Sequence, residues 1–523
     1  MHTQQLTQIH LGPKPQDYEP VTQNKVETSA YSLEEAKLQD NLLKLCPANL
    51  WPHGSYTSGC PRPILVGKYH QQQMQDLHEA LTIAITDIVQ RWWTDRDARF
   101  PERMPLEKEE EEILRWVDSQ VSCGNIAPFS KCRGSWRPDF LVDDDEMREE
   151  NYRITEINAR FSFNGFMHVA YGQEALNRSL PGGPGGLVGA INPDMVMLNS
   201  PPPVSTPVST PVDSNCFQIL DDLFGLFQPQ YPLHLLKGAE NGIDIHMFID
   251  AVWRRFGIKP RLITPADLRL FPDPRSKSGY RLCCLAKNRG DYFGSSSPTN
   301  SWTFTTNGGE VWEEIHQVGL ELHQKELVAL EPEMWRQLSL RCFNDMRTIL
   351  LVHDKRMLGI VKDEIPHLVA RMVLTPSQAD TLASGVVDTI LPGSRRLHDL
   401  LELSRASPQL RHEYILKPIR SGKGDGIVFG DEIDADEWVA ALEGLVSPKV
   451  VPGVTCVVQR RISPRLYDLA LKASVGMGRH ALVGTYHVAN GKLLGLGIWR
   501  AGSGRIVAVS SGGSWMCSVL RHE

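Results

Sequence analysis

The most constraining stretch of this 523-residue sequence runs from Tyr414 to Gly430 and reads YILKPIRSGKGDGIVFG. Apolar residues at 414–416 and 427–429 suit two buried strands. Three glycines lie between them: Gly422, Gly424 and Gly426. Glycine adopts backbone angles that other residues resist, so the pattern predicts a β-hairpin with a glycine loop. Such a loop can hold phosphate oxygens on its N–H groups while Lys417 supplies positive charge. The alternative is an ordinary glycine-rich turn with a solvated lysine, because short glycine motifs often match by chance.

Composition narrows the class of protein. A hydrophobic content of 41% and a charged content of 22% are typical of a soluble globular chain with room for two or three domains. The net charge of −7 and the lack of a long Lys/Arg run argue against nucleic acid as a partner. The first residues lack the apolar core of a secretory signal, and no apolar run reaches bilayer length. Ten cysteines show no zinc-type spacing. We therefore expect a reduced, cytoplasmic protein without a membrane partner or a structural zinc site.

The order of patterns along the chain predicts a mixed α+β and α/β protein. Helical periodicity covers 71–93 and 109–120, and a strand, a helix and a strand within 231–263 fit a parallel crossover unit. We predict five regions: a polar N-terminal arm with one helix (1–60), helices plus candidate metal-binding strands and a Pro-rich insertion (61–212), an α/β unit (213–330), a subdomain containing the hairpin (331–465), and C-terminal antiparallel strands completing the sheet (466–523).

A second informative stretch contains Arg137-Pro138-Asp139 and, later, Glu156-Ile157-Asn158. Residues two apart on a strand face the same way, so Glu156 and Asn158 point to one side of their strand, and Arg137 faces the same side as Asp139 on the other strand. Two carboxylates and an amide oxygen form a hard-oxygen set suited to Mg²⁺, with Asp139 as the third member. The alternative for Glu156 and Asn158 alone is the wet face of an antiparallel sheet.

The combination with a second lysine, Lys355 in LVHDKRMLGIV, resembles the ATP-grasp superfamily, and specifically its glutathionylspermidine synthase branch. In most ATP-grasp enzymes the metal motif follows the lysine strand. In that branch an R-x-D and then an E-x-N precede the lysines, as they do here. Residues 231–263 are similar to the preATP-grasp domain of the branch, and the resemblance extends from about residue 130 to the end.

The resemblance implies an ATP-grasp-like fold with a preATP-grasp α/β unit and a glycine-rich lid. It implies ATP and Mg²⁺ as cofactors and a ligase that joins a small carboxylic acid to an amine through an acyl phosphate, in the biosynthesis of a small molecule. The implied metal ligands are Asp139, Glu156 and Asn158. Arg137 would bind the acyl phosphate. The implied nucleotide-binding residues are Lys355, Lys417, Ser421, Gly422, Gly424, Gly426 and Gln459, the last on a strand that passes the adenine.

Some features depart from the family pattern. The G-I-R-E of that branch appears here as Gly497-Ile498-Trp499-Arg500-Ala501, with the arginine displaced by one place and the acid missing. Arg160 is a further candidate for the acyl substrate, with a surface salt bridge as an equal alternative. The rival functions are an ATP-dependent small-molecule kinase on the same scaffold and a catalytically inactive nucleotide-binding module. A homodimer is the expectation for the oligomeric state.

Overall fold

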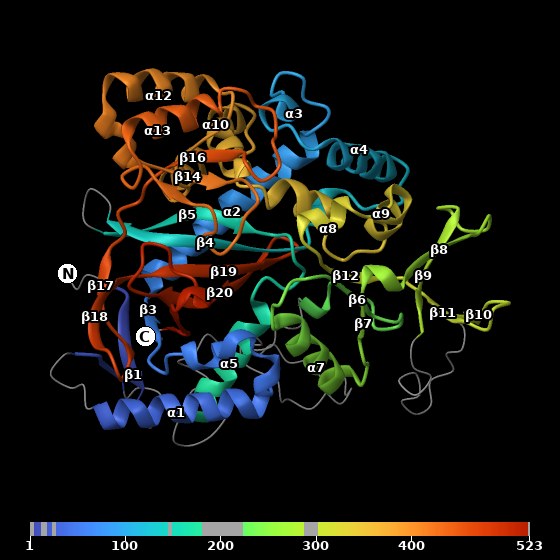
Figure 1. The fold of residues 1–523 in the computed structure, drawn as a ribbon, viewed down its shortest axis with the longest axis horizontal. Coiled ribbons are helices and arrows are strands. Elements are labelled where there is room, and N and C mark those ends of the chain that lie inside the picture. Colours follow the sequence, from blue (N-terminus) through green and yellow to red (C-terminus); the bar gives the residue numbers. More distant parts are fainter. Residues whose placement is uncertain are drawn as a thin grey trace.

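The computed structural model describes residues 5–11, 18–22, 28–144, 149–179, 223–286 and 302–520 (Figure 1). The Pro-rich insertion predicted at 201–211 lies outside these residues. The predicted mixture of helices and sheets is confirmed.

The largest sheet has six strands and joins segments that are far apart in the sequence. Its strand order is β22 (Ser514–Met516), β21 (Trp499–Ala501), β19 (Val483–Ala489), β4 (Ser135–Asp144) and β5 (Glu150–Asn158), with β20 (Lys492–Leu496) also paired to β19. Every pairing in it is antiparallel. The predicted antiparallel C-terminal strands therefore lie beside the strands of the Arg137 and Glu156 motifs.

Alternation along β4 and β5 explains why one face of this sheet is core. Phe140, Val142, Tyr152 and Ile154 are almost fully buried in the largest hydrophobic cluster. The same cluster contains the apolar side of α2 (Lys68–Arg91), including Leu77, Leu81, Ile85 and Ile88. α2 and α4 (Lys108–Ser122) confirm the helices predicted at 71–93 and 109–120.

The predicted hairpin is confirmed and belongs to a second sheet. β14 (Tyr414–Pro418) pairs antiparallel with β15 (Val428–Phe429), and the sheet order is β13 (Thr389–Ile390), β16 (Cys456–Arg460), β14, β15. Helices α12 (Arg395–Ala406) and α13 (Ala435–Glu443) pack on this sheet through Leu397, Leu401 and Trp438 (Figure 1). Val387 N donates to Ile154 O at 3.0 Å, which attaches the segment before β13 to strand β5. The segment leading into the hairpin sheet is therefore attached to the six-stranded sheet at strand β5.

The predicted crossover unit is also confirmed. β6 (His234–Lys237), α7 (Asp244–Phe256) and β7 (Arg261–Ile263) form a parallel β-α-β unit, and β12 (Val318–Glu321) adds a further parallel strand. Gly257 ends α7 with φ +65°, a left-handed conformation that suits glycine. Four strands form a projecting antiparallel sheet beside this unit: β8 (Leu268–Pro272), β9 (Tyr280–Leu285), β10 (Thr303–Thr305) and β11 (Val311–Glu314) (Figure 1).

The N-terminal segment, predicted as a polar arm with one helix (1–60), contains two strands as well as that helix. β1 (Thr7–Leu11) pairs with β2 (Tyr18–Pro20) and β3 (Ile64–Val66), and β3 pairs with β23 (Ser518–Leu520) at the other end of the chain. Leu6 and Ile9 are buried by this pairing. The predicted helix is α1 (Thr28–Leu45), which packs along α5 (Phe166–Ser179). A few apolar residues in a polar segment are enough to anchor it once a distant edge strand is available.

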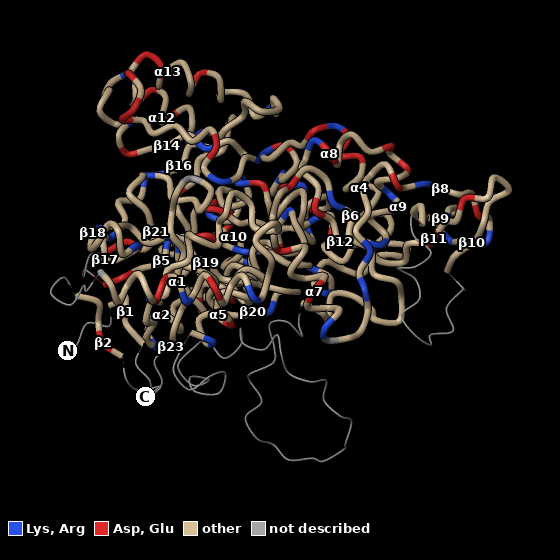
Figure 2. Tube along the Cα trace, turned by 60° about the horizontal axis from the view of Figure 1, so that its bottom comes forward, with Lys and Arg blue, Asp and Glu red and all other residues tan. Residues whose placement is uncertain are grey.

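The remaining elements connect these layers. They are α3 (Phe100–Arg103), α8 (Gln324–Val328), α9 (Pro332–Ser339), α10 (Arg356–Ala370), α11 (Pro376–Gly385), β17 (Leu466–Lys472) and β18 (Gly476–Ala481). Within the described parts of the chain, no helix combines the length and apolarity needed to cross a lipid bilayer. In the view of Figure 2, basic and acidic residues are interleaved along the elements.

Candidate active site

The R-x-D and E-x-N motifs lie opposite each other on adjacent strands. In the β4–β5 register Arg137 faces Asn158, and Asp139 faces Glu156. Directly opposed residues of an antiparallel pair have Cβ atoms about 5 Å apart, so the two carboxylates share one small area of the sheet. The predicted grouping of these four residues is therefore what the strand register produces.

A β-bulge shapes this area. Asp139 pairs with Glu156 and the next residue, Phe140, pairs with Ile154, so Thr155 is an extra residue on β5. A bulge leaves one residue outside the regular ladder and redirects the side chains around it. Here the bulge keeps Ile154 in the core, turns Glu156 to the opposite face, and leaves the Thr155 carbonyl to side-chain donors.

Two lysines from other elements converge on Glu156. Lys355 Nζ lies 3.4 Å from Glu156 Oε2, and Lys417 Nζ lies 3.9 Å from the same oxygen. Lys417 is on β14, and Lys355 immediately precedes α10, with its N–H bound to Ile419 O at 3.1 Å. Both lysines are about 95% buried. The predicted phosphate-binding lysines are thus neighbours of the predicted metal ligand, although they are 62 residues apart in the sequence.

The charges in this cluster act strongly on one another. Burial alone would raise the pKa of Glu156, but Lys355, Lys417, Arg500 and Arg137 outweigh it and lower that pKa. Burial lowers the pKa of Lys417 to about 8, since the opposing attraction of Glu156 only partly compensates. Four cations surround the two carboxylates of Asp139 and Glu156, which suits a polyanionic ligand such as a nucleotide triphosphate.

Asp139 is held by two arginines. Arg137 donates from Nε and Nη2 to the two Asp139 oxygens at 2.8 and 3.3 Å, and Nη1 donates to Asn164 O at 3.0 Å. Arg500 on β21 also donates to Asp139 Oδ2. The fork of Arg137, predicted to bind an acyl phosphate, is therefore engaged with its own neighbour on β4 in this structure.

The glycine loop lies over the lysines. Lys355 Nζ donates to the Ser421 carbonyl, which ties the start of the loop to the site. Lys423, Gly424 and Gly426 have positive φ angles of 59°, 80° and 72°. A Cβ on Gly424 would lie 2.2 Å from Ile506 Cγ2, whereas a Cβ on Gly422 would meet nothing within 4 Å. The loop therefore depends on glycine at 424 for its packing, and much less at 422.

Gln459 on β16 makes a hydrogen bond to Lys417. Its Oε1 accepts from Lys417 Nζ at 3.3 Å, and its Nε2 donates to Thr155 O and Thr389 Oγ1, each at 3.1 Å. The side chain is 1% exposed. Both N–H groups of its amide donate to the protein and its oxygen accepts from Lys417, so this residue positions Lys417.

The donor set fits a divalent cation. A carboxylate has about four lone-pair sites, and Asp139 uses three of them on Arg137 and Arg500. Both lysines face Glu156 Oε2, and in the part of the chain that the structure describes no hydrogen bond to Oε1 is formed. Asn158 would contribute its amide oxygen, since its Nδ2 is a donor that cannot bind a cation. Oxygens from Asp139, Glu156 and Asn158 would suit Mg²⁺, which takes few protein ligands and completes its shell with water and phosphate.

Comparison with known proteins identifies the family of the chain. The family model described as the AnkG N-terminal domain matches residues 77–351. A curated protein of Aspergillus thermomutatus, the ATP-grasp enzyme ankG, is 34% identical over 451 residues, which is 85% of this chain and 85% of that protein.

The chain belongs to the AnkG family of ATP-grasp enzymes. This confirms the ATP-grasp resemblance and an ATP-grasp-like fold, and it supports an ATP-dependent ligase in general. Among solved structures, a glutathione synthetase-like effector (GSS30) of Globodera pallida in its apo form aligns with a TM-score of 0.49 and 12% identity, over 95% of this chain and 98% of that chain.

Two parts of the AnkG-family site were missed from sequence. Arg500 was noticed only as a displaced residue of a late motif, yet β21 brings it onto Asp139. The Thr155 carbonyl accepts from Lys417 at 3.1 Å and from Gln459. The G-I-x-R motif could have pointed to Arg500. The Thr155 carbonyl could not have been found, because a main-chain acceptor created by a bulge has no signature in the sequence.

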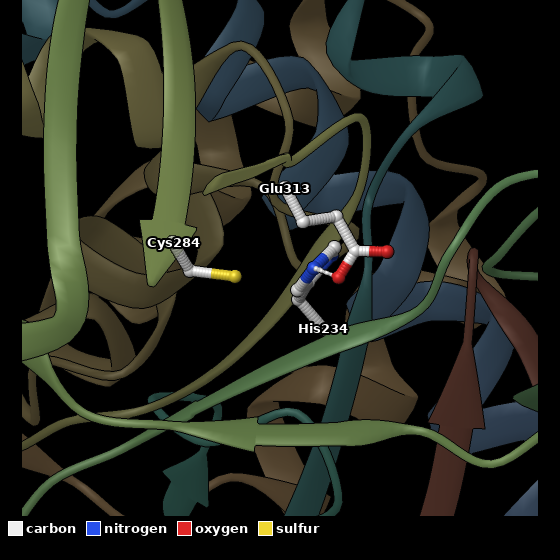
Figure 3. Close-up of side chains that lie close together, drawn as sticks. All are labelled: His234, Cys284 and Glu313. Carbon is white, nitrogen blue, oxygen red and sulfur yellow. Dashed lines mark hydrogen bonds and ion pairs between the residues drawn. The ribbon is translucent and has the colours of Figure 1, made fainter. Parts of the chain in front are cut away.

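A second polar cluster in this AnkG-family chain joins His234 on β6, Cys284 on β9 and Glu313 on β11 (Figure 3). Their possible ligand atoms lie within 4.8 Å of one another, and all three residues are buried. Glu313 already accepts from His234 at 3.2 Å and pairs with Arg261 at 2.7 Å. Burial raises the pKa of the Cys284 thiol to about 12. The cluster is therefore explained as an Arg–Glu–His pair network beside a protonated thiol.

Proposed function

We propose that this chain is an ATP- and Mg²⁺-dependent ligase that joins a small carboxylic acid to an amine through an acyl phosphate. The observation that carries the proposal is the convergence of Lys355 and Lys417 on Glu156, opposite Asp139, beneath the glycine loop. Membership of an ATP-grasp family supports the use of ATP.

The proposed reaction has two steps. A carboxylate oxygen of the acid attacks the γ-phosphorus of ATP, the bond to the β-phosphate oxygen breaks, and ADP leaves. The amine nitrogen then attacks the acyl carbon, the carbon–oxygen bond to phosphate breaks, and inorganic phosphate leaves as the amide forms. Asp139, Glu156 and Asn158 would hold Mg²⁺, which would neutralise phosphate charge when bound.

The residues of the chain have distinct tasks in this scheme. Lys355 and Lys417 bind phosphate oxygens, since they are the buried cations nearest to the metal ligands. Arg137 and Arg500 hold Asp139 in place when no nucleotide is bound. The loop 421–426 covers the lysines and keeps water from the acyl phosphate, which hydrolyses readily.

The test is the release of ADP and phosphate with Mg·ATP across a panel of acids and amines, with mass spectrometry of the products. A ligase requires both an acid and an amine for phosphate release and gives a product whose mass equals their sum minus water. ADP with a stable phosphorylated product identifies the kinase instead. Lys417→Met is expected to abolish turnover, and Lys449→Met, an exposed lysine on the loop after α13, serves as the matched control. Full activity of Lys417→Met would contradict the assignment.

A further inference from the structure

Arg160 has a buried guanidinium group that lacks a hydrogen-bond partner among the described residues. The residue follows β5 by two positions, and only 7% of its surface is exposed. Its Nε and Nη2 have no partner in the part of the chain that the structure describes. A surface salt bridge, one of the two alternatives from the sequence, is therefore wrong for this residue. Leaving a charged group buried and unpaired is costly, so such a group points to a missing partner.

The unpaired atoms form one particular edge of the guanidinium. Elsewhere in this chain the same edge holds carboxylates in a bidentate manner. Arg356 donates from Nε and Nη2 to the two oxygens of Asp354 at 2.9 and 2.8 Å, and Arg347 donates to both oxygens of Asp345 at 2.8 Å. The fork geometry matches a carboxylate, which takes two parallel N–H···O bonds. Arg160 thus has a carboxylate-binding edge that is left without a hydrogen-bond partner among the described residues.

Two carboxylates act electrostatically on Arg160, and each already has a cation. Asp354 takes the Arg356 fork and also lies 3.5 Å from Arg420 Nε. Glu110 accepts from Arg420 and from the Glu107 N–H through Oε2, while its buried Oε1 has no hydrogen-bond partner among the described residues. Arg420 itself adds positive charge beside Arg160. In the described part of the chain neither carboxylate makes a hydrogen bond to Arg160 Nε or Nη2, so this fork lacks a bidentate partner.

Arg160 lies near the catalytic cluster but apart from its phosphate-binding groups. His353 connects the two areas, since it interacts electrostatically with Arg160 and also with Lys355 and Glu156. The charges that act most strongly on Glu156 are those of Lys355, Lys417, Arg500 and Arg137. Asn344 Nδ2 donates to the carbonyl of Ala159 at 3.1 Å and holds the backbone beside Arg160. The arginine is thus a fixed anchor next to the reacting groups.

We propose that Arg160 binds a carboxylate of the substrate that the reaction leaves intact, so that the ligase acts on an acid carrying a second carboxylate. This rests on the proposed function for the reacting carboxylate, but the anion site is a separate claim about Arg160. A phosphoryl oxygen of the nucleotide has related chemistry, and the experiment separates the two sources.

The experiment measures thermal unfolding of the full chain with Arg160→Gln, Arg160→Lys and the control Arg395→Gln, which removes a 94% exposed arginine. The probes are succinate, glutarate and L-glutamate, with butyrate as the monocarboxylate, inorganic phosphate and Mg·ADP. The dicarboxylates are expected to stabilise the wild-type and Arg395→Gln proteins, and to bind about ten- to a hundredfold more weakly to Arg160→Gln. Arg160→Lys keeps the charge but loses the fork, so it is expected to recover little of this binding.

Two further readouts separate a ligand site from a structural role. Without ligand, Arg160→Gln is expected to unfold at the same or a higher temperature than wild type, because a buried unpaired charge has been removed. Mg·ADP is expected to stabilise all variants equally. A loss of the phosphate or Mg·ADP response in Arg160→Gln would assign the site to the nucleotide and overturn the proposal.

Equal dicarboxylate responses in wild type and Arg160→Gln, including no response in either, would also overturn it. So would a lower unfolding temperature of ligand-free Arg160→Gln, which is the result expected if an ordered water links Arg160 to Glu110. A wild-type protein that responds to dicarboxylates but not to Mg·ADP would refute the proposed ATP chemistry while leaving the anion site standing.

Discussion

Replacing Glu156 with glutamine tests the electrostatic core of the site. The substitution keeps the shape of the side chain and removes its charge, leaving Lys355 and Lys417 without their shared carboxylate. At an effective dielectric constant of about 20, each of these attractions, over 3.4 and 3.9 Å, is worth about 4 to 5 kcal/mol. The buried carboxylate also loses its own desolvation penalty, which offsets part of that sum. Breaking a buried pair by removing one partner typically costs about 3 to 5 kcal/mol, and we expect a loss at the lower end of that range.

The assay is urea-induced unfolding without nucleotide at pH 7, followed by tryptophan fluorescence. Glu156→Gln is expected to lower the free energy of unfolding by about 3 kcal/mol. Lys417→Met in the same background removes one of the two unpaired cations, so the double variant is expected to be more stable than Glu156→Gln alone. The sign of this double-mutant cycle is the decisive feature.

The reasoning would be refuted in either of two ways. A Glu156→Gln protein as stable as wild type would mean that the lysines do not depend on this carboxylate. Losses of Glu156→Gln and Lys417→Met that simply add would mean that the two residues are not coupled. Glu156→Gln is also expected to lose turnover, because it removes a ligand of the proposed metal.

Three other outcomes are expected. Because the pKa of Lys417 is about 8, affinity for Mg·ADP measured by calorimetry should fall as pH rises from 7 to 9. A Mg·ADP affinity that does not change with pH would contradict this role of Lys417. The free energy of unfolding should rise from pH 8 to about 10.5, because the unfolded lysine still binds its proton in that range while the folded lysine has lost it. Gln459→Leu should move the pH midpoint of Mg·ADP binding lower, because charged Lys417 loses an acceptor; an unchanged midpoint would count against that role. Gly424→Ala should destabilise the loop by about 1 to 2 kcal/mol because of its positive φ, and should also lower kcat because the new methyl group contacts Ile506. The control Gly422→Ala should retain near wild-type kcat. Equal kcat values for the two variants would show that the loop does not need this packing.

Much of the fold could be predicted because its signals are local. The hairpin at Tyr414–Phe429 and the β-α-β unit at 231–263 follow from strand and helix periodicity together with glycine positions. The strand pairing of the N-terminal arm was not predicted, because polarity averaged over 60 residues hides the few apolar ones, Leu6 and Ile9, that are buried in the folded chain.

The candidate site, like the fold, could be predicted from the sequence only in part. The sequence by itself determined which chemical groups are present and the pairing of Arg137 with Asp139 on one strand face, because alternation along a strand is local. Tertiary structure alone decided that Lys355, Lys417 and Arg500 meet these residues, that Thr155 becomes an acceptor, and that Arg160 is left without a partner. The physical reason is that distances between segments hundreds of residues apart are set by strand register, a bulge and packing between sheets.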